Sequence, residues 1–295
     1  MVQKIKFIEK PYESEEVKKI LHPLVSEWFF AKFKDFSLTQ LYGVKVINDR
    51  KNILISAPTG GTKTLTAFLG IINYLVSLAI KNELENKIYA VYVSPLKALV
   101  NDIGINLIEP LKEINELAKK KDLKMQEIRV GVRTGDTSAS ERAKMAKRVP
   151  HLYITTPETL AILLSTVKFK ENLRDVKYVI VDEIHSLAEN KRGTHLSISL
   201  DRLQNLCKEE FTRIGLSASI APLDKIAEFL VGVNRNCKIA DVQFNKKMDL
   251  KVLSPVPDLI NTTHENLHKN MYSLLHNLIQ EHRTTLIFTN TRSAT

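Results

Sequence analysis

The sequence predicts an α/β fold in which helices cover both faces of a mostly parallel β-sheet. Short runs of apolar residues alternate with longer helical segments along most of the 295 residues. Strands that are apolar throughout are typical of parallel sheets, because helices bury both of their faces. Open sheets of this kind bind ligands at the carboxyl ends of their strands. We therefore expect the functional residues directly after the predicted strands.

The predicted elements follow one another in a regular order. The predicted strands are 52–56, 88–93, 127–132, 151–155, 177–181 and 211–216. The predicted helices are 63–81, 97–121, 138–148, 157–165, 193–208 and 223–231. Beyond residue 240 the character of the sequence changes, and we predict a strand at 249–253, a helix at 265–282 and a strand at 284–289. These three elements bury too little apolar surface for a core of their own, so we interpret them as the start of a second α/β domain.

Three parts are therefore expected along the chain. They are an N-terminal helical segment at 1–36 that packs on the first domain, a first α/β domain at 37–244, and a linker with the start of the second domain at 245–295. A hydrophobic content of 44% and a charged content of 26% exclude a mainly disordered chain. The most apolar stretch, 65–80, is shorter than a membrane span and contains Asn73, so we expect a buried helix, a soluble protein and no membrane partner.

The charge and the cysteine content narrow the function classes further. Lysine and arginine number 43 against 33 acidic residues, and the resulting charge of +10 favours an anionic partner, with nucleic acid first. The chain has only two cysteines, Cys207 and Cys237, which excludes a disulfide framework and a cysteine-rich zinc site. A reducing, cytoplasmic location is the expectation that follows.

A candidate phosphate-binding loop lies at 57–64, between a predicted strand and a predicted helix. Such a loop needs inward-pointing backbone N–H groups, a lysine for the β and γ phosphates and a hydroxyl for Mg²⁺. Lys63 and Thr64 supply the lysine and the hydroxyl, and the dipole of the following helix favours an anion. The loop residues expected to contact the nucleotide are Thr59, Gly60, Gly61, Thr62, Lys63 and Thr64.

Thr62 stands at the loop position where glycine is usual. If the loop requires a positive φ there, a β-branched residue costs ~1–3 kcal/mol. The alternative interpretation of the whole segment is an ordinary turn that is rich in glycine and threonine.

A second segment, 178–185, is an apolar strand that ends in two carboxylates. A buried charge is costly unless a cation accompanies it, so this strand end suggests a metal. We expect Asp182 to hold Mg²⁺, directly or through water, and Glu183 to act as the general base on the attacking water. The alternatives are a solvated strand end and, for His185, a purely structural histidine. The phosphate-loop candidate favours catalysis, and the spacing of His185 from Asp182 favours a coupling role.

These segments resemble motifs of the DExH-type helicases of superfamily 2, and within them the large helicase-related (Lhr) group. Asp182-Glu-Ile-His185 and the ten residues after it are similar to the extended motif II of that group. Further similar segments are 93–99 (motif Ia), 133–137 (the loop before motif Ib), 155–160 (motif Ib), 215–219 (motif III) and 286–292 (motif IV). Gln40, 17 residues before Ala57, matches the adenine-reading glutamine of the Q motif.

The resemblance covers nearly the whole chain and implies an ATP-driven motor between two RecA-like domains of the P-loop NTPase type. ATP and Mg²⁺ are the implied cofactors, with Gln40 at the adenine and Thr64 and Asp182 at the metal. Ser217 and Ser219 are implied to couple hydrolysis to domain movement. The implied partner is single-stranded DNA or RNA, or a forked duplex. Members of the Lhr group act mainly on DNA and travel 3′ to 5′.

The residues expected to contact the strand combine cations and hydroxyls at or after predicted strand ends with further positions in the matching motifs. They are Pro95, Lys97, Arg133, Thr134, Gly135, Thr137, Thr156, Pro157, Glu158, Asn290 and Arg292. Cations and hydroxyls suit phosphates better than bases, so we expect binding that is salt-sensitive and largely blind to sequence.

The sequence departs from the family pattern in three places. Thr62 replaces glycine, and motif III ends in Ser219 instead of threonine. Motifs V and VI, whose arginines would stabilise the transferring phosphoryl group, are not in the chain, and such arginines are worth ~10³–10⁵ in rate. We therefore expect low ATP turnover from the chain alone, unless a second chain or a missing C-terminal part supplies these motifs.

Three hypotheses follow. The first is the motor fragment of a helicase that binds ATP and single strands. The second is a non-catalytic, nucleotide-dependent nucleic-acid-binding module from a split or decayed helicase gene, with a loop weakened at Thr62. The third is an unrelated phosphate-loop ATPase such as a transporter subunit, which the absence of single-strand binding at low salt would favour.

Overall fold

An eight-stranded parallel sheet forms the centre of the computed structural model, which describes residues 4–58, 62–95, 103–167, 169–218, 221–242 and 249–289. The strands are β1 (Ile5–Phe7), β2 (Ile53–Ser56), β3 (Ala90–Val93), β4 (Val130–Arg133), β5 (Leu152–Thr155), β6 (Tyr178–Val181), β7 (Thr212–Ser217) and β8 (Cys237–Asp241). They lie in the order β1-β8-β2-β7-β6-β3-β5-β4, and every pairing is parallel. All carboxyl ends therefore meet at one edge, as the predicted fold requires.

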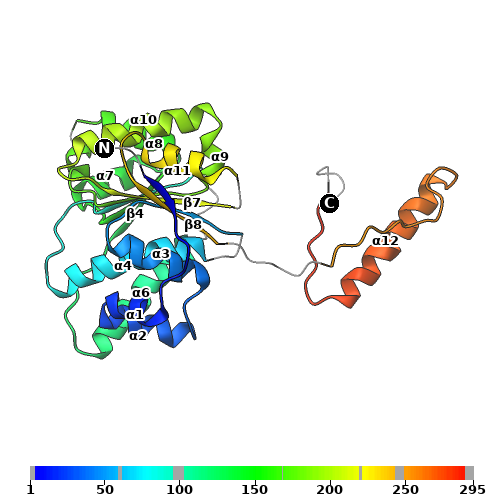
Figure 1. The fold of residues 1–295 in the computed structure, drawn as a ribbon, viewed down its shortest axis with the longest axis horizontal. Coiled ribbons are helices and arrows are strands. Elements are labelled where there is room, and N and C mark those ends of the chain that lie inside the picture. The colour runs from blue at the N-terminus through cyan, green and yellow to red at the C-terminus, as the bar shows by residue number, and fades with distance from the viewer. Residues whose placement is uncertain are drawn as a thin grey trace. The chain divides into compact units, whose positions relative to one another are not determined.

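Helices cover both faces of this sheet (Figure 1). On one face lie α1 (Ser14–Ile20), α2 (Pro23–Lys32), α3 (Leu38–Asn48), α4 (Lys63–Ile80), the π-helical turn η2 (Gly104–Ile108) and α6 (Glu109–Lys120). On the other lie α7 (Ala139–Lys147), α8 (Pro157–Ser165), the 3₁₀ turn η3 (Phe169–Leu173), α9 (His185–Ala188), α10 (Lys191–Leu206) and α11 (Leu223–Val231). Successive strand side chains point to opposite faces, so Ile53 and Ile55 join one apolar cluster and Leu54 joins the other.

The most apolar helix, α4, lies in the protein core. By length and composition it could cross a membrane, but 67% of its apolar window is buried inside the protein. Its one asparagine, Asn73, accepts a hydrogen bond from the backbone N–H of His22 at 2.6 Å and donates to the carbonyl of Ile20 and to Asn48. These contacts satisfy the amide that the sequence places in the apolar run, and they fix the N-terminal helices to α4.

Two strands at one side of the sheet, the edge strand β1 and its neighbour β8, were absent from the sequence prediction, and two predicted strands are wrong. β1 and β8 pair with each other, and β8 also pairs with β2, so the N-terminal segment contributes a strand as well as helices. The predicted strands 249–253 and 284–289 are not strands. The residues described between 249 and 289 contain no other strand to pair with either, and an unpaired strand leaves its backbone groups without partners.

The chain divides into two compact units, 1–244 and 245–295. The first unit contains the complete sheet and its two helical layers. The second unit contains α12 (His264–Glu281), which agrees with the helix predicted at 265–282. Whether this unit begins a second RecA-like domain stays a prediction.

His151 should make the stability of the first unit depend on pH. This side chain is 1% exposed, its Nδ1 accepts the backbone N–H of Arg129 at 3.1 Å, and its Nε2 has no partner among the described residues. Burial, and next the charge of Arg129, lower its pKa from 6.5 to about 4. The folded state thus binds the proton more weakly than the unfolded chain. The stabilisation is complete above pH 6.5 and is lost as the pH falls from 6.5 toward 4.

We expect this single group to remove about 3 kcal/mol from the free energy of unfolding across that interval. Urea unfolding at a series of pH values measures the effect. In His151→Asn the side-chain oxygen keeps an acceptor near Arg129 but does not titrate, so the acid-induced loss should become smaller by about this amount. An unchanged pH dependence in the variant would contradict the assignment to His151.

Candidate functional site

Strand order brings the predicted phosphate loop and the acidic strand end to the same edge of the sheet. β2, β7 and β6 are neighbours, and their last residues are Ser56, Ser217 and Val181. Neighbouring strands lie about 4.8 Å apart, so the ends of β2 and β6 are separated by about 10 Å, with the end of β7 between them. The three predicted motifs at these ends therefore surround one space.

Lys63 begins α4 and points back into the loop. Its Nζ donates hydrogen bonds to the carbonyls of Ala57 at 2.5 Å and Pro58 at 3.2 Å, and the residue is 8% exposed. Burial lowers the pKa of this ammonium group, while the nearby charges of Glu183 and Asp182 act in the opposite direction. Lys63 is thus a buried cation that faces the acidic pair. The loop residues Thr59, Gly60 and Gly61 lie outside the described residues.

Thr62 adopts the left-handed backbone conformation that we expected at this position because glycine is usual there. Its φ is +56° and its ψ is +19°. This conformation costs a non-glycine residue about 1–2 kcal/mol. Two contacts hold it: its hydroxyl lies 2.6 Å from the hydroxyl of Ser37, and its carbonyl accepts the backbone N–H of Thr66. The hypothesis that this position requires a positive φ is therefore correct, and the contact with Ser37 could not be predicted from the sequence.

Replacing Thr62 with glycine should relieve this strain. We expect Thr62→Gly to raise the free energy of unfolding by about 1 kcal/mol, because glycine adopts positive φ without the steric penalty of a β-branched residue. The strained conformation is already present without a nucleotide, so its relief should leave the affinity for ATP unchanged. Chemical unfolding and calorimetric titration with ATP measure the two effects. Ser37→Ala is the matched control, since it removes the hydroxyl contact but leaves the backbone strain, and it should destabilise the loop.

Asp182 is buried at the end of β6 with both carboxylate oxygens occupied. Its Oδ1 accepts the backbone N–H of Glu183 at 2.8 Å, and its Oδ2 accepts the hydroxyl of Tyr92 from β3. The residue is 3% exposed, and burial raises its pKa. Tyr92 stacks on Phe68 of α4, so its position is fixed from two sides. Sequence reasoning missed Tyr92, because its role depends on β3 lying beside β6.

Glu183 and His185 connect the acidic strand end to the end of β7. The two atoms Nε2 of His185 and Oε2 of Glu183 are 3.1 Å apart. The Nδ1 of His185 accepts the backbone N–H of Ala218 at 3.3 Å and lies 3.3 Å from the hydroxyl of Ser217. Because Nδ1 accepts, the ring proton of a neutral imidazole resides on Nε2, the ring nitrogen that lies near Glu183. His185 thus joins the segments that resemble motifs II and III, while Ser219 lies outside the described residues.

Gln40 has a structural role that sequence reasoning missed. It is 2% exposed, and its Oε1 accepts the backbone N–H of Ser37 at 2.8 Å, while the hydroxyl of Ser37 accepts the N–H of Gln40. This reciprocal pair is a capping box at the start of α3, and the spacing Ser-x-x-Gln is its sequence signal. Ser37 therefore contacts both Gln40 and Thr62. The adenine-reading role of Gln40 stays a prediction.

Several of the residues predicted to contact nucleic acid lie at the carboxyl ends of β3, β5 and β4, or directly after them. These strands follow β6 in the strand order. Val93, Thr155 and Arg133 are register partners at the ends of β3, β5 and β4. Thr156 caps α8 and Pro157 begins it. The loop after Arg133 is held by the backbone N–H of Thr134, which donates to the hydroxyl of Thr137 at 2.9 Å. Gly135 lies in that loop, and a side chain added there would meet no atom within 4 Å.

Glu158 is engaged by a partner that the sequence did not reveal. Arg192 of α10 donates to Glu158 at 2.7 Å and 3.4 Å, and also to the backbone carbonyl of Pro95 at 3.0 Å. The ion pair lowers the pKa of Glu158. Arg192 therefore links the segment after β3 to the segment after β5, and Glu158 is the residue through which it holds the second of these segments. The predicted residues Lys97, Asn290 and Arg292 lie outside the described residues.

Comparison with known proteins agrees with this geometry. The sequence profile of the DEAD/DEAH box helicase family matches residues 38–229. The chain is 53% identical over 292 residues to the ATP-dependent helicase Lhr-Core of Methanocaldococcus jannaschii, a match that covers 99% of this chain and 34% of that protein. It is 33% identical to the Lhr helicase/uracil glycosylase of Escherichia coli, over 96% of this chain and 20% of that protein.

A solved structure shows the same arrangement of elements. The structure of Mycobacterium smegmatis helicase Lhr bound to ssDNA and AMP-PNP superposes with a TM-score of 0.80 at 37% identity, over 93% of this chain and 34% of that one. The chain thus spans about a third of the length of the archaeal Lhr-Core protein and of the mycobacterial Lhr structure. The prediction of a RecA-like fold similar to that of the Lhr helicases is confirmed, and the chain belongs to the DEAD/DEAH box helicase family.

Proposed function

We propose that this chain is the nucleotide-binding core of a motor that moves along single-stranded nucleic acid, and that DNA is the preferred nucleic acid. The observation that carries the proposal is the continuous path of contacts from Glu183 through His185 to Ser217 and Ala218, which begins with Nε2 of His185 at 3.1 Å from Oε2 of Glu183 and ends with Nδ1 accepting the backbone N–H of Ala218. This path connects the acidic end of β6 to the end of β7, the strand that lies between β6 and the strand before the phosphate loop, β2. A motor needs such a link, because hydrolysis must change the conformation of neighbouring segments.

The side chains at this edge fit a magnesium triphosphate. The hydroxyl of Thr64 makes no hydrogen bond with another described residue, and Asp182 is a buried carboxylate at the facing strand end. No cluster of three or more His, Cys, Asp or Glu side chains occurs in the described part of the chain. Mg²⁺ in nucleotide sites is usually held by one or two carboxylates together with the phosphates. We infer that Thr64 and Asp182 hold Mg²⁺ together with ATP, where the ion neutralises charge on the phosphates.

The remaining residues have roles that follow from their contacts. Lys63 is the cation for the β and γ phosphates, and it would exchange its bonds to the carbonyls of Ala57 and Pro58 for bonds to phosphate oxygens. Glu183 is the general base, and the ring of His185 lies against its carboxylate, with Nε2 3.1 Å from Oε2. Gln40 has its Oε1 in the capping box, and its Nε2 donates to no described residue, so this nitrogen can meet the adenine.

The strand path is proposed along the ends of β3, β5 and β4. There Arg133, Thr134 and Thr137 present one cation and two hydroxyls, a combination that suits phosphates, and Thr156 lies beside them with its hydroxyl in the cap of α8. The path continues from the nucleotide edge, because β3 pairs with β6. The mycobacterial relative, solved with ssDNA and AMP-PNP, supports both ligands for this chain.

Equilibrium binding of a labelled single strand of about 20 nucleotides tests the proposal. We expect binding at low salt that weakens steeply as salt is added, and that tightens when AMP-PNP and Mg²⁺ are present. Arg133→Ala should weaken strand binding without changing the affinity for AMP-PNP. Strand binding that ignores the nucleotide would overturn the coupling, and no strand binding at low salt would overturn the proposed motor.

A non-catalytic, nucleotide-dependent binding module is the second candidate function. The left-handed Thr62 favours it, because the strain there weakens the loop that must hold the phosphates. Thr62→Gly separates the two candidates by its effect on ATP affinity. An affinity that rises about tenfold would indicate a loop that has lost function, whereas an unchanged affinity would favour the motor.

A further inference from the structure

A groove of about 750 Å³ lies beside β4, the outermost strand on one side of the sheet. The strand β1 is the outermost strand on the opposite side. The lining of the groove includes Glu127 to Val130, which lead into β4, and Pro150, which precedes β5. It therefore extends toward the amino ends of the strands, whereas the nucleotide and strand-binding residues follow the carboxyl ends. Neither proposed ligand accounts for it.

The floor of the groove is apolar and includes an open strand edge. β4 pairs only with β5 among the described strands. The carbonyl of Arg129 accepts the N–H groups of His151 and Leu152, so the backbone groups of Arg129 face β5. Backbone groups of successive residues in a strand point to opposite sides, so those of Val130 and Val132 point away from β5. The apolar side chains along the groove are Ile108, Leu111, Met125, Ile128, Val130, Met145 and Pro150.

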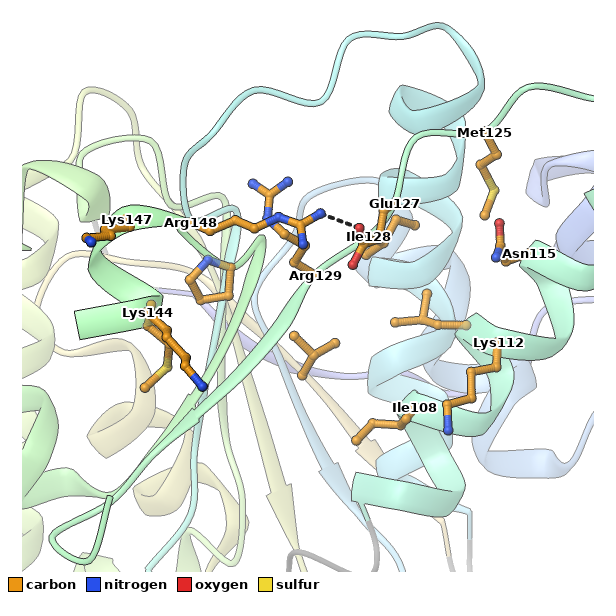
Figure 2. A pocket seen from close by; sticks show the side chains of 14 residues that line it. Ile108, Lys112, Asn115, Met125, Glu127, Ile128, Arg129, Lys144, Lys147 and Arg148 are labelled. Carbon is orange, nitrogen blue, oxygen red and sulfur yellow. Dashed lines mark hydrogen bonds and ion pairs between the residues drawn. The ribbon is translucent and has the colours of Figure 1, made fainter. Parts of the chain in front are cut away.

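The two walls come from helices on opposite faces of the sheet (Figure 2). α6 contributes Lys112, and α7 contributes Lys144 and Lys147. All three side chains are exposed, and none forms an ion pair with another described residue. The one acidic lining residue, Glu127, is paired with Arg148. The groove thus carries unpaired positive charge on both sides of an apolar floor.

We propose that this groove binds an extended, acidic segment of a partner protein, which adds as a strand to the open edge of β4. An added strand would satisfy the outward backbone groups of Val130 and Val132, as in other cases of β-strand addition. Its alternate side chains would point toward α6 and toward α7, where carboxylates meet Lys112 on one side and Lys144 and Lys147 on the other. The apolar floor and the unpaired strand edge favour a peptide over a nucleic acid, which needs cations but no apolar groove.

The test uses the full chain and a capped peptide of about eight residues in which pairs of glutamates alternate with pairs of valines, so that each face of the strand carries carboxylates. A peptide with lysine in place of glutamate controls for charge, and one with N-methyl groups on alternate backbone nitrogens cannot pair as a strand. We expect the acidic peptide to bind and to protect the amides of Val130 and Val132 from hydrogen exchange. The lysine and N-methyl peptides should bind at least tenfold more weakly.

Charge reversal of the three lysines, in Lys112→Glu/Lys144→Glu/Lys147→Glu, should weaken binding of the acidic peptide about tenfold or more. The control Lys10→Glu/Lys19→Glu/Lys34→Glu changes the net charge equally, at exposed lysines outside the groove, and should bind the peptide like the parent chain. Equal binding of the N-methyl and unmodified peptides, or no binding of the acidic peptide, would overturn the proposal. So would a short DNA duplex that binds through these three lysines, or self-association of the chain that the triple variant abolishes.

Discussion

Replacing Lys63 with alanine is expected to weaken the binding of ATP by roughly 100-fold or more. Hydrogen bonds to charged groups contribute about 1.5–3 kcal/mol each, and this ammonium group can make at least two to a triphosphate, as it does now to the carbonyls of Ala57 and Pro58. The alanine variant also leaves the acidic pair Asp182 and Glu183 without its buried counter-charge, which adds repulsion toward the phosphates.

Calorimetric titration with ATP, ADP and adenosine measures this effect and locates it. The loss should be largest for ATP and smallest for adenosine, because Lys63 acts on phosphates. Lys81→Ala is the matched control, since this lysine ends the same helix at its other terminus and is exposed. An affinity for ATP that survives Lys63→Ala would mean that the nucleotide binds elsewhere, and the proposed function would fail with it.

The sequence predicted the centre of the sheet well and its edges poorly, for a physical reason. The central strands β2, β3, β5, β6 and β7 are buried on both faces, so apolar runs identify them without any knowledge of their neighbours. β8 includes Lys238 and Asp241, and β1 has only three residues, so neither carries that pattern. The segments at 249–253 and 284–289 show the converse, because an apolar run becomes a strand only beside a partner.

The candidate site divides in the same way. Lys63, Asp182 and Glu183 could be predicted because each follows a strand, and parallel strands end at one edge. Tyr92 and Ser37 could not, because their contacts with Asp182 and Thr62 arise from strand order and helix packing. The groove beside β4 could not be predicted either. The basic helix that lines it, α7, has the charge pattern of an ordinary solvent-exposed helix.

A glycine beside the site should have the largest effect on stability. Gly193 lies in the first turn of α10, where a Cβ atom would stand 1.9 Å from the carbonyl oxygen of Leu187 and 2.6 Å from its carbon. Both atoms are backbone, so the clash can be relieved only if α9 moves away from α10. We expect Gly193→Ala to lower the free energy of unfolding by about 3 kcal/mol or more and the Tm by about 10 °C.

The same displacement should reach the nucleotide site, because α9 begins at His185, whose ring contacts Glu183 and the end of β7. A variant that remains folded should therefore lose the nucleotide dependence of single-strand binding more than its affinity for AMP-PNP. Gly104→Ala is the control, since an added Cβ there meets no atom within 4 Å and should change stability by less than about 1 kcal/mol. If Gly193→Ala unfolds at the same temperature as the parent chain, α9 is not held against α10, and the rigid placement of His185 that the coupling requires does not exist.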